Sequence, residues 1–130
     1  MASDMNAALD ELSQGARRLN DLTDLTTTAV TRVESILNDL SIGIGARVAF
    51  DQHCELCYER RLSSEPFQIF VIAFNKAKDW SELSREQKIK AIAVLPELIR
   101  LLVAETNKRI DNAEAALAEV AEILSPDRQG

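Results

Sequence analysis

The sequence predicts an α+β fold, and three observations predict it. Apolar residues repeat every seven positions near both ends of the chain, which indicates long helices. Between these two regions apolar residues alternate with other residues, which is typical of short strands. The chain has 130 residues, 46% of them hydrophobic, which is enough for one modest core. We therefore expect one domain over residues 1–130, with two long helices and a small three-stranded antiparallel β-meander between them.

The first helix is predicted over residues 5–40. Its apolar residues fall on three neighbouring heptad positions and form one broad stripe. The first position holds Met5, Leu12, Leu19, Thr26, Val33 and Leu40. The second, three residues later, holds Ala8, Gly15, Leu22, Ala29 and Ile36, and the third holds Leu9, Ala16, Thr23, Val30 and Leu37. Such a helix is ~54 Å long at ~1.5 Å per residue, so something long must pack along it.

Gly43 and Gly45 are expected to end this helix, because glycine adopts turn conformations that do not continue a helix. The β-meander is predicted in residues 44–74. Its third run, residues 67–74, is apolar on both faces, so it is either central and covered on both sides or in contact with another protein. The same run also fits a helical stripe, which leaves an all-α bundle as the alternative fold.

The last helix is predicted over residues 84–124. Ser84 and Gln87 form a capping box at its start. Pro96 is expected to kink it, because proline removes one backbone hydrogen bond of the helix. The heptad repeat then returns: one position holds Val103, Ile110, Leu117 and Leu124, and the other holds Ile99, Thr106, Ala113 and Val120.

The two stripes predict that the long helices pack against each other in antiparallel orientation. Two paired helices bury only the side chains along a narrow line of contact, so the rest of a broad apolar stripe must be buried by another element. A homodimer that forms a four-helix bundle supplies it, whereas a monomer does so only if residues 85–95 fold back over the stripe. The side chains expected in the interface are Leu12, Leu19, Leu22, Val33, Ile36, Phe70, Ile72, Ile110 and Leu117.

The composition argues against two classes of partner. The net charge is −6, so the chain lacks the positive surface that contacts with phosphates require, and we expect no nucleic-acid partner. No apolar run approaches the ~20 residues that span a bilayer, and no basic stretch followed by an apolar run marks the start of the chain. We therefore expect no membrane partner and a cytoplasmic location, where the two cysteines stay reduced.

His53, Cys54 and Cys57 form the one cluster with the spacing of metal ligands. A structural zinc ion takes four ligands, but the chain has no further cysteine or histidine. A redox motif of this kind opens a helix, whereas here it begins a strand, where the two sulfur atoms point to opposite faces. We expect two buried thiols, with no bound metal and no cofactor.

No set of residues predicts catalysis, so we expect no enzyme activity. Asp51, His53 and either Cys54 or Cys57 include the residue types of an orienting group, a base and a nucleophile, but neighbours in sequence lack the spatial arrangement that such groups need. The leading hypothesis is a non-enzymatic protein–protein interaction or oligomeric scaffold protein, with an adaptor, chaperone-like or regulatory role. The alternative is a small metal- or thiol-based module that uses His53, Cys54 and Cys57.

Overall fold

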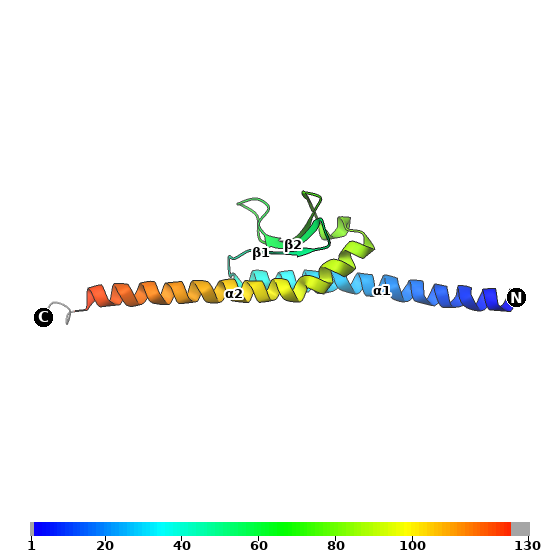
Figure 1. The fold of residues 1–130 in the computed structure, drawn as a ribbon, viewed down its shortest axis with the longest axis horizontal. Coiled ribbons are helices and arrows are strands. Elements are labelled where there is room, and N and C mark those ends of the chain that lie inside the picture. Colours follow the sequence, from blue (N-terminus) through cyan, green and yellow to red (C-terminus); the bar gives the residue numbers. More distant parts are fainter. Residues whose placement is uncertain (1, 126–130) are drawn as a thin grey trace.

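The computed structural model describes residues 2–125. A long helix, four strands, a short 3-10 helix and a second long helix follow one another along the chain. Figure 1 shows the sheet on one side of the two long helices, which extend beyond it in opposite directions. The predicted α+β class is confirmed, and the sheet excludes the all-α alternative.

The first helix, α1, spans Ala2–Leu40 and so begins three residues before the predicted start. It ends where expected, because Ser41 and Gly43 adopt positive φ angles of 51° and 64°, which do not continue a helix. Val30 and Leu37, in the second half of α1, are buried in the core. The first half of the helix contributes nothing to that core.

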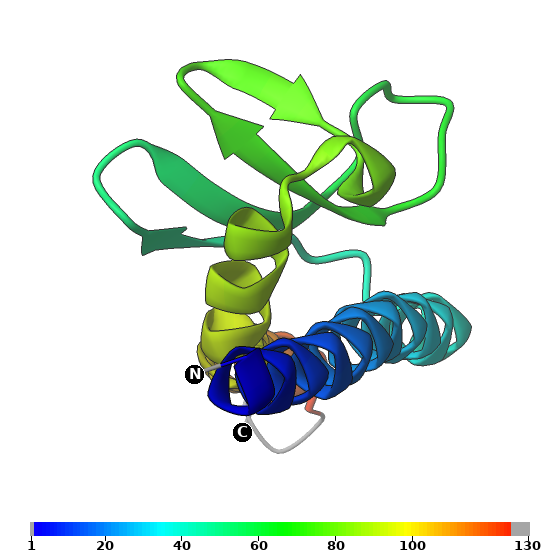
Figure 2. The ribbon, with the colours of Figure 1, turned by 90° about the vertical axis from the view of Figure 1, so that its right-hand side faces the viewer.

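The middle of the chain forms a four-stranded antiparallel sheet in the order β1-β2-β3-β4. The strands are β1 Ala46–Phe50, β2 Cys54–Glu59, β3 Gln68–Ala73 and β4 Lys76–Lys78. The three strands predicted in residues 44–74 are present, and residues 68–73 are strand and not helix. Figure 2, which looks along the helices, shows the sheet as a twisted layer above them.

Strand β4 was not predicted, because it has three residues and no large apolar side chain. It is formed by a two-residue turn at Phe74 and Asn75, both with positive φ angles. Two successive residues of this kind make the tight hairpin turn whose twist matches that of paired strands. The asparagine was the available signal, since asparagine tolerates this conformation better than most residues.

The sheet buries residues on both faces. Leu56 and Val71 belong to the main core, which they share with the helices. On the opposite face, Cys57 and Phe70 are paired across β2 and β3 and are also buried. The guanidinium group of Arg61 lies over the Phe70 ring, 5.2 Å from its centroid. The apolar third run is therefore central, but its second face is covered only in part, because Ile72 is half-buried and Phe74 is 66% exposed.

The second long helix, α2, spans Arg85–Leu124 and begins with the predicted capping box of Ser84 and Gln87. Pro96 lies inside this single helix, as expected. Figure 1 shows that the first turns of α2 are inclined to the rest of it. Its buried side chains are Ala91, Leu95, Leu98 and Leu102.

The two long helices run in the same direction, so the antiparallel packing predicted within the chain is wrong. Arg85, at the start of α2, donates a hydrogen bond to Asn20 of α1. Further along, Leu37 of α1 and Leu102 of α2 line one depression, so rising residue numbers on α1 match rising numbers on α2. The sheet is the reason, because its strands carry the chain back along α1 before α2 begins (Figure 1).

Candidate interaction surface

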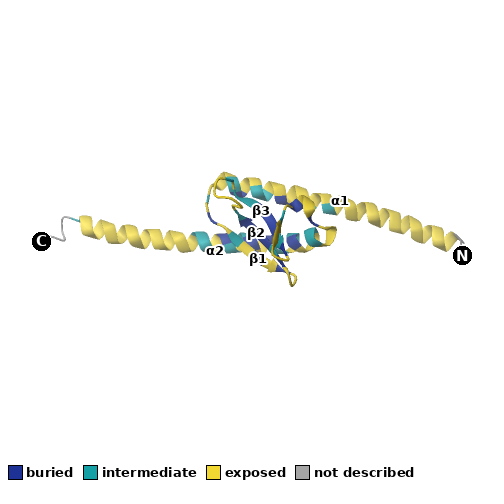
Figure 3. Ribbon diagram, turned by 90° about the horizontal axis from the view of Figure 1, so that it is seen from above, coloured by how far each residue is buried: buried dark blue, intermediate teal, exposed yellow. Residues whose placement is uncertain are grey.

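Each long helix continues beyond the sheet as an arm whose residues are all exposed. The α1 arm comprises residues 3–22, and the α2 arm comprises residues 107–124. Figure 3 shows the two arms at opposite ends of the molecule, exposed along their whole length, while the buried residues gather in the sheet and in the central parts of the helices. The arms hold nearly a third of the chain and take no part in its core.

The arms carry the heptad stripes that the sequence predicts. Leu12 and Leu117, one on each arm, are both 68% exposed. The other large apolar side chains exposed on the arms are Met5, Leu9, Leu19, Leu22, Ile110, Val120, Ile123 and Leu124. Single exposed leucines are common on protein surfaces, but a continuous apolar stripe of this length marks an interaction surface.

Such an arm is a weak structure on its own. An isolated helix of ~20 residues is marginally stable in water, because most helical stability in proteins comes from packing of the apolar face. Gly15 lies inside the α1 arm and lowers its intrinsic helical stability further. Covering each half-exposed leucine or isoleucine would contribute roughly 1 kcal/mol. The arms therefore gain much from a partner that lies along them.

Other large apolar side chains are exposed at the centre of the molecule. There Val30 and Leu37 of α1 turn into the core, while Leu25 and Ile36 stay more than half exposed. Val103 of α2 is exposed to a similar degree. The centre of the molecule thus adds three exposed apolar side chains to those of the arms.

A shallow depression of about 250 Å³ lies where α1 ends beside α2. Its lining is almost entirely apolar. The residues that line it are Leu37, Leu40, Ile42, Ile99, Leu102, Val103, Thr106 and Asn107. Since the last of these begins the α2 arm, the depression extends the stripe of that arm towards the core.

Most of the predicted interface residues lie on this surface. The exposed ones are Leu12, Leu19, Leu22, Ile36, Ile110 and Leu117. Val33 and Ile72 are half-buried, and Phe70 is only 4% exposed. Val33 packs against the chain's own core and Phe70 beneath Arg61, so neither presents a free surface. We keep the six exposed residues as the candidate site.

The three candidate metal ligands do not come together. Cys54 belongs to the core between sheet and helices, whereas Cys57 lies on the opposite face of β2, as its spacing predicts. The His53 ring lies against Phe74, with the ring centroids 4.9 Å apart. Between residues 2 and 125, no three histidine, cysteine or acidic side chains are close enough to hold a metal ion.

Asp51, His53 and Cys54 are not arranged as a catalytic set either. The Asp51 carboxylate accepts a hydrogen bond from the Gln52 backbone amide, at 2.8 Å, and another from Lys90. The amide and the lysine together lower the pKa of Asp51. Asp51, His53 and Cys54 do line one depression. The Asp51 carboxylate, however, bonds to Gln52 and Lys90, and the Cys54 side chain is only 6% exposed.

Burial raises the pKa of the Cys57 thiol from 9.0 to about 11. The native protein therefore holds this proton at pH values where the unfolded chain has released it. The contribution of this thiol to the free energy of unfolding is therefore present in full below pH 9. It should fall as pH rises, so that the free energy of unfolding is lower by about 2 kcal/mol at pH 11. Urea denaturation between pH 8 and pH 11 measures it. A Cys57→Ala variant is the control and should lose this part of the pH dependence.

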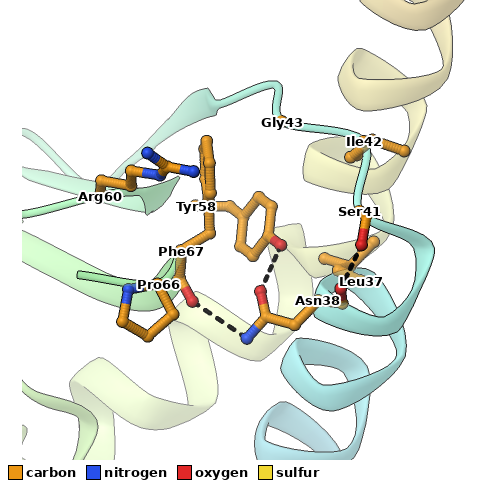
Figure 4. A pocket seen from close by; sticks show the side chains of 9 residues that line it. All are labelled: Leu37, Asn38, Ser41, Ile42, Gly43, Tyr58, Arg60, Pro66 and Phe67. Carbon is orange, nitrogen blue, oxygen red and sulfur yellow. Dashed lines mark hydrogen bonds between the residues drawn. The ribbon is translucent and has the colours of Figure 1, made fainter. Parts of the chain in front are cut away.

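Sequence reasoning missed a polar contact that fastens α1 to the sheet. Figure 4 shows Asn38 between Tyr58 and Phe67. The Tyr58 hydroxyl donates to Asn38 Oδ1 at 2.6 Å, and Asn38 Nδ2 donates to the Phe67 carbonyl oxygen at 3.1 Å. One turn earlier, Glu34 accepts a hydrogen bond from the Ile69 backbone amide at 2.8 Å. The sequence does not indicate that an asparagine near the end of a helix forms hydrogen bonds with a sheet.

Replacing Asn38 by alanine should lower the free energy of unfolding by about 2 kcal/mol, because the nearly buried Tyr58 hydroxyl loses its partner. Tyr58→Phe should cost about 1 kcal/mol, since it removes the hydroxyl as well as the bond. The double variant should then cost less than the sum of the two single changes. Chemical denaturation of all three variants measures this coupling, and strictly additive effects would contradict it.

Neither long helix, over the residues described, has a stretch apolar enough to cross a membrane. Comparison with protein-family models, with curated proteins and with solved structures gave no match. The evidence for the candidate site is therefore the exposed apolar stripe on the two arms.

Proposed function

We propose that this chain is a non-enzymatic protein that works through protein–protein contacts of its two arms, as an oligomeric scaffold. The observation that carries this proposal is the exposed heptad stripe on both arms. The stripe has the pattern by which helices recognise other helices, with large apolar residues seven positions apart. The sheet and the centres of the helices provide the folded body from which the arms extend.

The first partner we propose is a second copy of the chain. Every copy exposes two stripes, so each copy offers the helical surface that the other needs. An adaptor, chaperone-like or regulatory role then follows if the assembled helices or the sheet contact another protein. We also propose a cytoplasmic location, because both cysteines are free thiols and cytosol keeps thiols reduced.

The mass in solution tests this proposal. Sedimentation equilibrium over a hundredfold range of concentration should show a species of twice the 14.4 kDa of one chain. The dimer should dissociate on dilution, with loss of helical circular dichroism as the arms fray. A mass of one chain at every concentration would overturn self-association as the function of the arms.

A further inference from the structure

The geometry of the arms points to a reciprocal homodimer, in which the α1 arm of each copy packs antiparallel against the α2 arm of its partner. This inference rests on the proposed function and adds the arrangement of the partner. Within one chain the two arms lie at opposite ends and cannot meet (Figures 1 and 3). A second copy turned end to end brings its α2 arm alongside the α1 arm of the first.

The two arms match in length. The α1 arm has 20 exposed residues, from 3 to 22, and the α2 arm has 18, from 107 to 124. At ~1.5 Å per residue, they are ~30 Å and ~27 Å long. The two arms are therefore nearly equal in length, so each can lie along almost the whole of the other.

The sizes of the stripe residues favour antiparallel pairing. On the α1 arm, one heptad position holds the large Met5, Leu12 and Leu19, and the next holds the small Ala8 and Gly15 and, at the end of the arm, Leu22. The α2 arm also alternates, with the large Ile110 and Leu117 on one position and the small Ala113, followed by Val120, on the other. Thr106, just before the arm, continues the second position.

In an antiparallel pair each of these positions faces the other kind. Leu12 and Leu19 then meet small residues of the partner, as do Ile110 and Leu117, and only Met5 and Leu22 meet a valine, so most layers have even volume. A parallel pair sets large against large and small against small, which leaves bulges and gaps. With the arms fully overlapped, the layers pair Met5 with the partner's Val120, Ala8 with the partner's Leu117, Leu12 with the partner's Ala113, Gly15 with the partner's Ile110 and Leu19 with the partner's Thr106.

The exchange of unlike arms gives a closed dimer, whereas pairing of like arms does not. If α1 arms pair only with α1 arms and α2 arms with α2 arms, every copy needs two different neighbours and an open chain of copies results. Exchange of unlike arms satisfies both stripes with one partner, related by a twofold axis. It also places the central helices of the two copies together, which covers the exposed Leu25 and Ile36.

Distances between spin labels test the arrangement. Ser13 and Asp111 are exposed and lie beside the stripes, so Ser13→Cys and Asp111→Cys leave the layers intact. Cys54 and Cys57 are buried, so label should attach to the introduced cysteines, and unmodified protein is the control for labelling. Pulsed electron paramagnetic resonance then measures the distance between labels in the assembled protein.

We expect a label-to-label distance of about 50 Å for Ser13→Cys alone, because the two α1 arms point to opposite ends of the dimer, ~35 helical rises apart. An equimolar mixture of the Ser13→Cys and Asp111→Cys proteins should add a distance below about 25 Å, since these positions lie side by side across paired helices. A short distance for Ser13→Cys alone, or mass that grows without limit, would overturn the exchange while leaving self-association in place. A single-chain mass with no distance between labels would overturn both.

Discussion

Replacing Leu12 by glutamate should convert the dimer into folded monomers. Leu12 is 68% exposed within its own chain, so the substitution should not disturb the core. In the dimer it faces the partner's Ala113, and twofold symmetry places the new charge in both arm pairs. Burying a carboxylate without a partner costs several kcal/mol, so we expect the dissociation constant to rise at least a hundredfold.

Ser13→Glu is the matched control for this prediction. It places the same charge one residue away on the polar side of the helix, and it should leave the dissociation constant within a few fold of that of the unchanged protein. Sedimentation equilibrium measures both variants under one set of conditions. If Leu12→Glu dimerises as tightly as Ser13→Glu, the stripe of the α1 arm is not the contact surface.

Leu98→Ala should lower the stability of the domain by about 3 kcal/mol, whereas Leu117→Ala should weaken association. Both leucines lie on α2, but Leu98 is fully buried and Leu117 is 68% exposed. Truncating a buried leucine removes apolar contacts and leaves a cavity, and such changes cost about 2 to 5 kcal/mol. Truncating Leu117 removes surface that only the partner covers.

The effects of Leu98→Ala and Leu117→Ala should depend differently on protein concentration. The loss of unfolding free energy caused by Leu98→Ala should be the same at every protein concentration, because the cavity lies inside one chain. The loss caused by Leu117→Ala should appear in the dimer and vanish on dilution to monomers. Chemical denaturation at high and at low protein concentration provides the comparison. Equal losses for Leu117→Ala at both concentrations would indicate that its arm packs against its own chain.

Periodicity was sufficient to predict the elements that depend on a repeating apolar pattern. The ends of α1 and α2 lie within three residues of the predicted ones, and the strands in residues 44–74 follow from alternation. Strand β4 lacks such a pattern, because it is exposed and short and depends on the turn at Phe74 and Asn75. Its hairpin turn carried only the weak signal of one asparagine.

The direction of α2 could not be predicted from the stripes. A heptad stripe tells which face of a helix is buried, but both orientations of a partner helix bury the same face. The orientation depends on where the sheet delivers the chain, and this depends on strand order and loop path. The same limit applies to Val33 and Phe70, whose apolar character fits an interface as well as their actual places. Val33 packs against the core, and Phe70 is buried on the other face of the sheet beneath Arg61.

The arms contain the part of the candidate site that the sequence predicts best. Leu12, Leu19, Ile110 and Leu117 lie on the predicted stripe and are exposed in the chain. The contact between Asn38 and Tyr58 was missed because single polar residues form it across distant elements.

Hydrogen exchange of the arm amides, measured against protein concentration, tests most directly whether the stripes are covered by a second copy. The account predicts strong protection of residues 3–22 and 107–124 at high concentration, lost together from both arms on dilution while the sheet stays protected. Fast exchange of both arms at every concentration would contradict it, because the arms would then stand in water without a partner.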